Sequence, residues 1–212
     1  MNKESVISFF TALAAERTQP KTELLYTTPY TLLVAVILSA QATDVGVNKA
    51  TPALFKVADT PEKMLALGLE RLREKVKTIG LYNGKARNII AMSEILLRDH
   101  GGEVPRNREA LEKLPGVGRK TANVVLNEAF GEHTIAVDTH VFRVANRTGL
   151  ARGATVRVVE DKLMKVVPPQ FAQHAHHWLI LLGRYTCKAR KPLCPVCPVR
   201  QWCEYKDKTV EI

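Results

Sequence analysis

Apolar residues recur three or four positions apart along most of the chain, and strict apolar–polar alternation is nearly absent. This spacing is typical of amphipathic helices, and one clear example is Ile89, Ile90, Met92, Ile95, Leu96 and Leu97. Helix-start signals and glycines at expected helix ends punctuate the pattern. The start signals are Thr28-Pro29, Thr60-Pro61 and Asn107, and the glycines are Gly68, Gly80, Gly101 and Gly131. The pattern predicts an all-α protein of about ten short helices.

The longest apolar run, 32–40, contains one serine and is far shorter than the roughly 20 residues that cross a bilayer. It predicts a buried helix. The polar start of the chain, 1–5, has no apolar signal-peptide core behind it, so we expect a cytoplasmic protein with no membrane partner. No internal repeat is visible, and the loop at 131–133 is the candidate boundary between domains.

Composition adds a preference for a polyanionic partner. The hydrophobic content of 46% over 212 residues is enough for one or two cored domains and excludes a disordered chain. Lys plus Arg total 31 and Asp plus Glu total 21, so the net charge is 31 − 21 = +10, which fits either a nucleic-acid partner or a solvated basic surface. Residues 162–203 contain no acidic residue. The basic residues there are Lys162, Lys165, Arg184, Lys188, Arg190, Lys191 and Arg200, which favours the nucleic-acid partner.

All four cysteines fall in one short segment. Cys187, Cys194, Cys197 and Cys203 have the spacing C-x6-C-x2-C-x5-C. Two disulfides, a zinc ion or an iron–sulfur cluster could use them, and disulfides are disfavoured because nothing directs the chain to an oxidising compartment. Zinc ribbons usually have two separated C-x2-C pairs, and only one is present here. A [4Fe–4S] cluster therefore fits the spacing better.

The loop between the first two cysteines carries Lys188, Arg190 and Lys191. A cubane cluster with four thiolates is negatively charged, so these cations and Arg200 could balance its charge. They could also project toward a DNA phosphate. Both roles are compatible with the sequence.

A glycine turn separates a predicted helix at 107–113 from one that runs to about residue 129. Its core is Gly116, Val117, Gly118 and Arg119. Glycines on either side of one apolar residue allow a sharp turn and leave backbone amides unshielded at the positive end of the next helix. Such a turn can hold a phosphate, although an ordinary helix–helix turn also contains glycine pairs.

Three motifs together resemble one known family. L-P-G-V-G-R-K-T-A at 114–122 resembles a helix-hairpin-helix motif, which grips a DNA backbone without reading bases. With V-D-T-H at 137–140 and the four-cysteine segment, the whole chain resembles the helix-hairpin-helix DNA glycosylases, and within them the bacterial members with a [4Fe–4S] loop. The resemblance implies a six-helix barrel domain at 22–132, with the hairpin near 107–130. It also implies an iron–sulfur cluster domain formed by 1–21 and 133–212.

The resemblance further implies a function in base-excision repair. A bifunctional enzyme of this family removes oxidised pyrimidines from double-stranded DNA through a lysine Schiff base, and then nicks the strand 3′ to the abasic site by β-elimination. We expect a monomer associated with the bacterial nucleoid.

Site residues follow position by position from the resemblance. Lys120 is similar to the family's nucleophile, and Asp138 to its catalytic carboxylate; helix amides and nearby cations favour the neutral amine that an attack needs. Because a base inside a duplex is out of reach, the nucleotide must be flipped, and Gln41 would fill the gap while Leu81 wedges the stack. Without the family, Lys120 is a phosphate-contacting cation, Asp138 an N-cap, Gln41 a polar helix end and Leu81 a core residue.

Two other functions compete with this interpretation. An adenine-mismatch glycosylase would share the cluster and hairpin, but it lacks a catalytic lysine at the position of Lys120. A non-cleaving DNA-binding redox sensor would use the cluster itself as its functional group. Strand cleavage distinguishes the enzyme from the sensor.

Overall fold

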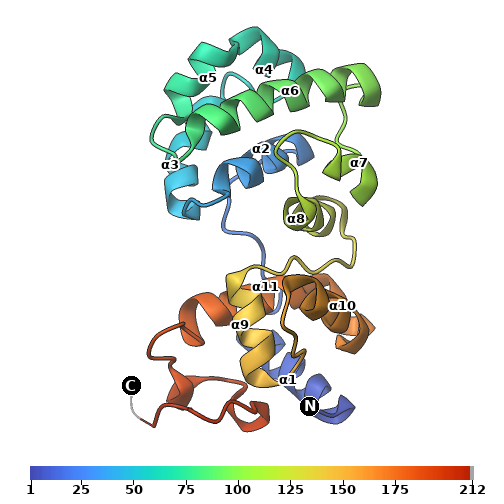
Figure 1. The fold of residues 1–212 in the computed structure, drawn as a ribbon, viewed down its shortest axis with the longest axis vertical. Helices are drawn as coiled ribbons and strands as arrows, with labels where there is room; N and C mark the ends of the chain where they lie inside the picture. Colours follow the sequence, from blue (N-terminus) through green and yellow to red (C-terminus); the bar gives the residue numbers. More distant parts are fainter. Residues whose placement is uncertain (211–212) are drawn as a thin grey trace. The chain divides into compact units, whose positions relative to one another are not determined.

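The structure is a computed structural model that describes residues 1–210, and these residues form helices and connecting loops with no β-strand (Figure 1). The all-α prediction is therefore confirmed. The chain divides into two compact units, one formed by 1–22 with 132–212 and the other by 23–131. Thr22 and Glu132, which we assigned to the barrel domain, belong to the first unit. Gly131 ends the preceding helix in a left-handed conformation, with φ of 70°.

The 23–131 unit contains seven helices around one apolar core. They are α2 (Pro29–Ser39), α3 (Asp44–Phe55), α4 (Pro61–Leu67), α5 (Leu69–Val76), α6 (Tyr82–His100), α7 (Arg108–Glu112) and α8 (Arg119–Phe130). Helix α6 packs against α4 and α5, and α2 packs against α8. Helices α2 to α6 and α8 make up the six-helix domain, and the short α7 leads into the hairpin.

The predicted helix starts are confirmed by their side-chain caps. The Thr28 hydroxyl accepts from the backbone N–H of Thr31, and the Thr60 hydroxyl accepts from that of Lys63. Each satisfies an amide that has no partner inside its own helix. The apolar run behind Thr28 is buried along its whole length from Tyr30 to Leu38, so α2 is the buried helix that the pattern predicted.

The other unit joins both ends of the chain around a second core. Its α-helices are α1 (Lys3–Glu16), α9 (Thr139–Thr148), α10 (Val156–Val166) and α11 (Ala172–Leu181). Short helices follow or precede them: η1 (Pro169–Phe171), η2 (Leu182–Thr186), η3 (Cys194–Val196) and η4 (Arg200–Trp202). The Trp178 indole N–H donates to the Arg17 carbonyl at 2.7 Å, which ties α11 to the end of α1.

None of the helices within residues 1–210 has both the length and the apolar character needed to cross a membrane.

Candidate functional site

The turn between α7 and α8 is anchored by its apolar residues. Leu114 and Val117 are buried in the core of the 23–131 unit, and the Val117 N–H donates to the Leu114 carbonyl at 3.1 Å. We predicted Val117 as a DNA-binding residue. Its side chain is only 6% exposed and its N–H is already paired, so in this structure it holds the turn in shape.

The two glycines of the turn have different reasons to be glycine. Gly116 has φ of 79°, and a Cβ there would lie 3.0 Å from the Asn88 side chain of α6. Gly118 has an ordinary φ of −94°, and a Cβ there would meet nothing within 4 Å. Gly118 is the N-cap of α8 and provides no side-chain cap at the positive end of the helix dipole.

Lys120 lies in the first turn of α8 and is exposed. No hydrogen bond or ion pair joins its Nζ to any residue within 1–210, so the amine can approach a ligand. Its neighbour Arg119 is only partly exposed and lies 4.0 Å from a carboxylate oxygen of Glu112 on α7. The helix start thus presents two cations, of which one already has a carboxylate close by.

Asp138 is the N-cap of α9, and its two oxygens have separate partners. Oδ1 accepts from the backbone N–H groups of His140 and Val141, each at 2.8 Å. Oδ2 lies 3.1 Å from Nδ1 of the His140 ring. The carboxylate is 15% exposed, so it is fixed in orientation while still reachable by solvent. The N-cap role is therefore real, and the His140 ring lies against the other carboxylate oxygen.

Gln41 and Leu81 are non-glycine residues in the left-handed region, with φ of 55° and 61°. That conformation is uncommon for a bulky side chain and costs about 1–2 kcal/mol. Both side chains are exposed, and Leu81 is 66% exposed, so the alternative of a core residue is wrong for it. A Cβ on Gly80 would lie 4.0 Å from the Gln41 carbonyl oxygen, so the two loops lie side by side.

The four cysteines share one cavity. Cys187, Cys194, Cys197 and Cys203 line it together with Thr148, Leu182 and Val199. Burial, with smaller contributions from the other three thiols, raises the pKa of Cys197 to about 11. Burial also raises the pKa of Cys203. No group of three or more His, Cys, Asp or Glu side chains within 1–210 converges closely enough to hold a single metal ion.

This donor set suits a cluster that is ligated by four separated thiolates. Each cysteine is half-buried at the end or start of a short helix, with Cys187 after η2, Cys194 opening η3, Cys197 after η3 and Cys203 after η4. Iron ligation removes the thiol protons that burial would otherwise retain. The cavity is lined by all four thiols together with the cations Arg200 and Lys208, and it therefore fits the negatively charged [4Fe–4S] group.

Arginines on α9 hold the backbone of the cysteine segment. Arg143 donates to the carbonyls of Cys187 at 2.9 Å and Gly183 at 2.7 Å. Arg147 donates to the carbonyls of Lys188 at 2.6 Å and Ala189 at 2.9 Å, and its guanidinium lies over the Tyr205 ring. Sequence reasoning did not predict these roles. The i, i+4 spacing of two cations on one helix face, directly after V-D-T-H, was the available signal.

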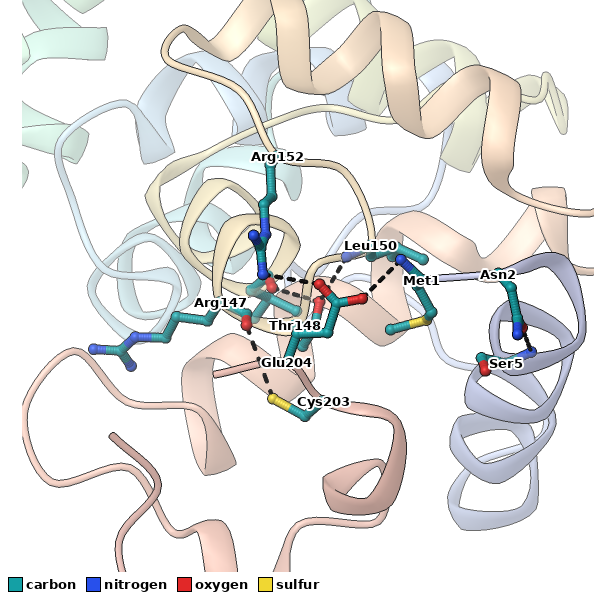
Figure 2. A network of polar contacts seen from close by, with 10 residues as sticks. Met1, Asn2, Ser5, Arg147, Thr148, Leu150, Arg152, Cys203 and Glu204 are labelled. Carbon is teal, nitrogen blue, oxygen red and sulfur yellow. Dashed lines mark hydrogen bonds and ion pairs between the residues drawn. The ribbon is translucent and has the colours of Figure 1, made fainter. Parts of the chain in front are cut away.

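The last cysteine is also close to the start of the chain (Figure 2). Glu204 accepts from the Met1 ammonium group and from Arg152, at 2.8 Å each. Figure 2 shows the Glu204 carboxylate between these two groups, with Cys203 below it and its thiol facing the Arg147 carbonyl. An ion pair thus fixes the residue that follows the last cysteine.

The cations of the loop 188–193 make no contact of this kind with the cysteine segment. Lys188, Arg190 and Lys191 are all exposed, and no hydrogen bond or ion pair joins their side chains to residues within 1–210. The cations that do contact the cysteine segment are Arg143, Arg147 and Lys208, whose ammonium donates to the Cys203 carbonyl. The geometry therefore leaves the three loop cations available to an external anion.

Comparisons with known proteins agree with this arrangement. Residues 34–169 match the model of the HhH-GPD superfamily of base excision DNA repair proteins. Residues 187–203 match the model of the iron–sulfur binding domain of endonuclease III. The class of protein is thus a helix-hairpin-helix base excision repair protein with an iron–sulfur domain.

Relatives narrow the class further. The chain is 61% identical to endonuclease III of Haemophilus influenzae over 98% of its length and 99% of that protein, and 60% identical to endonuclease III of Escherichia coli K12 with the same coverage. A solved structure of a trapped endonuclease III–DNA covalent intermediate covers 96% of each chain at 46% identity, with a TM-score of 0.89. A thermostable thymine-DNA glycosylase is 27% identical, with a TM-score of 0.83.

The chain belongs to the endonuclease III family. It is a base excision repair enzyme that acts on double-stranded DNA as a DNA glycosylase and abasic-site lyase. Its cofactor is a [4Fe–4S] cluster, held in the 187–203 domain.

Proposed function

We propose that Lys120 is the nucleophile with which this enzyme removes oxidised pyrimidines. The observation that carries the proposal is an exposed lysine in the first turn of α8 in the hairpin, whose Nζ has no partner among residues 1–210. Its neutral Nζ attacks C1′ of the damaged nucleotide, and the electron pair of the glycosidic bond leaves with the base. The sugar ring then opens and a Schiff base forms between Nζ and C1′.

The same Schiff base explains strand cleavage. It acidifies the protons on C2′, and loss of one of them expels the 3′ phosphate by β-elimination. Hydrolysis then returns the lysine. A relative with 46% identity forms a trapped covalent intermediate with DNA, which is the behaviour that this route requires.

In this proposal, Asp138 stabilises the positive charge that develops on the sugar as the base departs. Its Oδ1 is occupied by two backbone N–H groups of α9, so the carboxylate keeps a fixed orientation. Oδ2 lies beside the His140 ring, and this oxygen would face the reacting sugar. His140 therefore supports the carboxylate at Oδ2, while Oδ1 keeps its two backbone hydrogen bonds.

The DNA grip combines three sets of residues. The turn at Gly116 and Gly118, together with Arg119 and the start of α8, contacts the backbone phosphates. Val117 is buried and anchors that turn in the core. Gln41 fills the gap left by the flipped nucleotide and Leu81 wedges into the stack. Their exposed, left-handed backbone positions support these roles, because strained conformations tend to occur at functional sites.

Lys188, Arg190 and Lys191 would contact phosphates, and Cys187, Cys194, Cys197 and Cys203 would ligate the cluster that shapes their loop. The cluster when bound supplies a cross-link between the four cysteines. The protein acts as a monomer on genomic DNA, at the bacterial nucleoid in the cytoplasm.

Borohydride reduction during incubation with duplex DNA that carries thymine glycol tests the nucleophile. Wild-type protein should give a covalent protein–DNA adduct, because hydride reduces the Schiff base to a stable amine. Lys120→Gln should give none and should still bind DNA, since the hairpin glycines are unchanged. Lys113→Gln removes an exposed lysine from the other side of the turn and should keep the adduct. An adduct with Lys120→Gln would refute the assignment.

Replacing Lys191 with glutamate tests the loop cations. DNA binding should weaken for every sequence, and the slope of log affinity against log salt should fall by about 1, as expected for a lost phosphate contact. Lys63→Glu, at an exposed position on α4, is the matched control for charge reversal. An unaltered salt slope with Lys191→Glu would assign this lysine to the cluster loop alone.

A further inference from the structure

Lys85 is a buried cation that the proposed chemistry does not use. It lies in the first turn of α6 and is 6% exposed, although lysine is almost never buried without a partner. Its Nζ donates to the Leu38 carbonyl at 2.8 Å, which is its one hydrogen bond within the described residues. Burial lowers the pKa of Lys85, and no carboxylate opposes that shift. The position therefore costs free energy, and a neutral residue would avoid this cost.

The Leu38 carbonyl belongs to the buried C-terminal end of α2. The neighbouring carbonyls have local partners: Val36 accepts from the Ser39 hydroxyl, Ile37 from the Ala40 N–H and Ser39 from the Ala42 N–H. Leu38 itself is fully buried, and the last turn of α2 contains no basic residue. Lys85 supplies from another helix both the missing donor and the positive charge that suits the negative end of the helix dipole.

The same lysine is adjacent to the two loops that carry Gln41 and Leu81. Gln41 follows Leu38 by three positions. On the other side, the Lys85 N–H donates to the Leu81 carbonyl at 3.2 Å in the first turn of α6. One residue therefore joins the end of α2, which leads to Gln41, to the residue that begins α6. Strained backbone persists only where the surroundings over-determine it. The Lys85 side chain provides the connection to α2, and its backbone N–H provides the connection to Leu81.

We propose that Lys85 is a positioning residue that holds the Gln41 and Leu81 loops in one arrangement, ready to enter the gap left by a flipped nucleotide. This inference rests on the roles proposed for Gln41 and Leu81. A lysine that only filled space would be replaceable by methionine without changing either loop. A positioning lysine would not be replaceable by methionine, because the Leu38 carbonyl would lose its hydrogen-bond donor and residues 39–43 would lose their connection to α6.

The test compares Lys85→Met with a matched control, Ser93→Ala. The Ser93 hydroxyl is also a buried group of α6 that bonds to α2, at 2.7 Å from the Tyr30 hydroxyl, but it meets the opposite end of α2. In free protein, hydrogen exchange of the amides at 39–43 should accelerate in Lys85→Met and remain at the wild-type rate in Ser93→Ala. Wild-type exchange in Lys85→Met would overturn the positioning role, whatever the enzyme's chemistry.

The second arm asks whether Lys85 acts through Gln41. With 2-aminopurine opposite an abasic-site analogue, we expect Lys85→Met and Gln41→Ala each to reduce the fluorescence change at saturating protein, and Ser93→Ala to retain it. Base release should slow by on the order of 10- to 100-fold, as for a misplaced site residue. Lys85→Met combined with Gln41→Ala should be no worse than Gln41→Ala alone. Additive losses would overturn the inference.

Two outcomes separate this inference from the proposed function. If Gln41→Ala is impaired and Lys85→Met is normal, the function stands and the positioning role of Lys85 is wrong. If Gln41→Ala behaves as wild type, the role of Gln41 fails and the inference fails with it. Should Lys85→Met not fold, Lys85→Gln enters the same measurements, since its shorter neutral side chain also removes the charge from the end of α2.

Discussion

Helix α2 and the cysteine segment 187–203 are held in place in opposite ways. Nine of the eleven residues of α2 are buried, and its ends are completed by Thr28 and Lys85. In 187–203, only Pro192 and Val199 are buried, and the backbone is held by arginine side chains from α9. Burial of apolar side chains positions most of α2, whereas the cysteine segment depends on polar contacts and its cluster.

The difference has a functional consequence. A buried apolar helix gives Gln41 a rigid base from which a strained residue can project. A loop that is held by a cluster can leave Lys188, Arg190 and Lys191 exposed, because it has no need to bury apolar side chains. The same chain thus builds the base of the Gln41 loop from packing and the charged surface loop from polar contacts and cross-linking.

The largest expected effect is loss of the cluster. Cys197→Ser should lose iron. The free energy of opening that governs amide exchange in residues 187–203 should fall by more than about 4 kcal/mol, as for other lost metal sites. Residues 29–39 should keep their protection, because their core is separate. Iron analysis with hydrogen exchange measures both, and Val196→Ala, at an exposed neighbour, is the control. Full protection of 187–203 in iron-free protein would break the comparison.

The second effect is on packing of α2. Leu33 is fully buried, so Leu33→Ala should lower the free energy of unfolding by about 2–5 kcal/mol in urea titration, through lost burial and a cavity. Iron content should be unchanged. Val57→Ala, at a half-exposed position in the same unit, should change stability by less than about 0.5 kcal/mol. Loss of iron with Leu33→Ala would mean that the two regions are not independently held.

The smallest effect concerns Glu204. The hydrogen bond from the Met1 ammonium, with Arg152 beside it, holds the pKa of Glu204 below its ordinary value of 4.5. Because the folded pKa is depressed, the stabilisation is present above 4.5 and is lost as pH falls through the folded value. The pair is partly exposed, so Glu204→Gln should cost about 0.2–1 kcal/mol at neutral pH.

Urea titrations of wild type and Glu204→Gln at decreasing pH should therefore converge below pH 4.5. Glu16→Gln, at an exposed position near the end of α1, is the control and should follow the wild type. A difference between wild type and Glu204→Gln that grows as pH falls would show that the Met1 pair does not stabilise the cysteine segment.

Local sequence determined much of this protein. The start of α2 could be predicted from Thr28-Pro29 and the apolar run, because capping and amphipathicity depend on neighbours in the chain. The four cysteines could be assigned to one site because all of them lie within a single short segment. The hairpin was recognisable because its turn needs glycine at Gly116, where φ is positive.

Only the tertiary structure decided how remote groups meet. Gly116 and Gly118 looked equivalent in sequence, but only Gly116 faces a side chain, that of Asn88 on α6. Nothing in the local sequence distinguishes Lys85 from a surface lysine, but the packing of α6 on α2 buries it against the Leu38 carbonyl. Arg143 and Arg147 gained their roles from a loop some 40 positions away. Periodicity reports which face of a helix is apolar, but not which distant backbone group that face will meet.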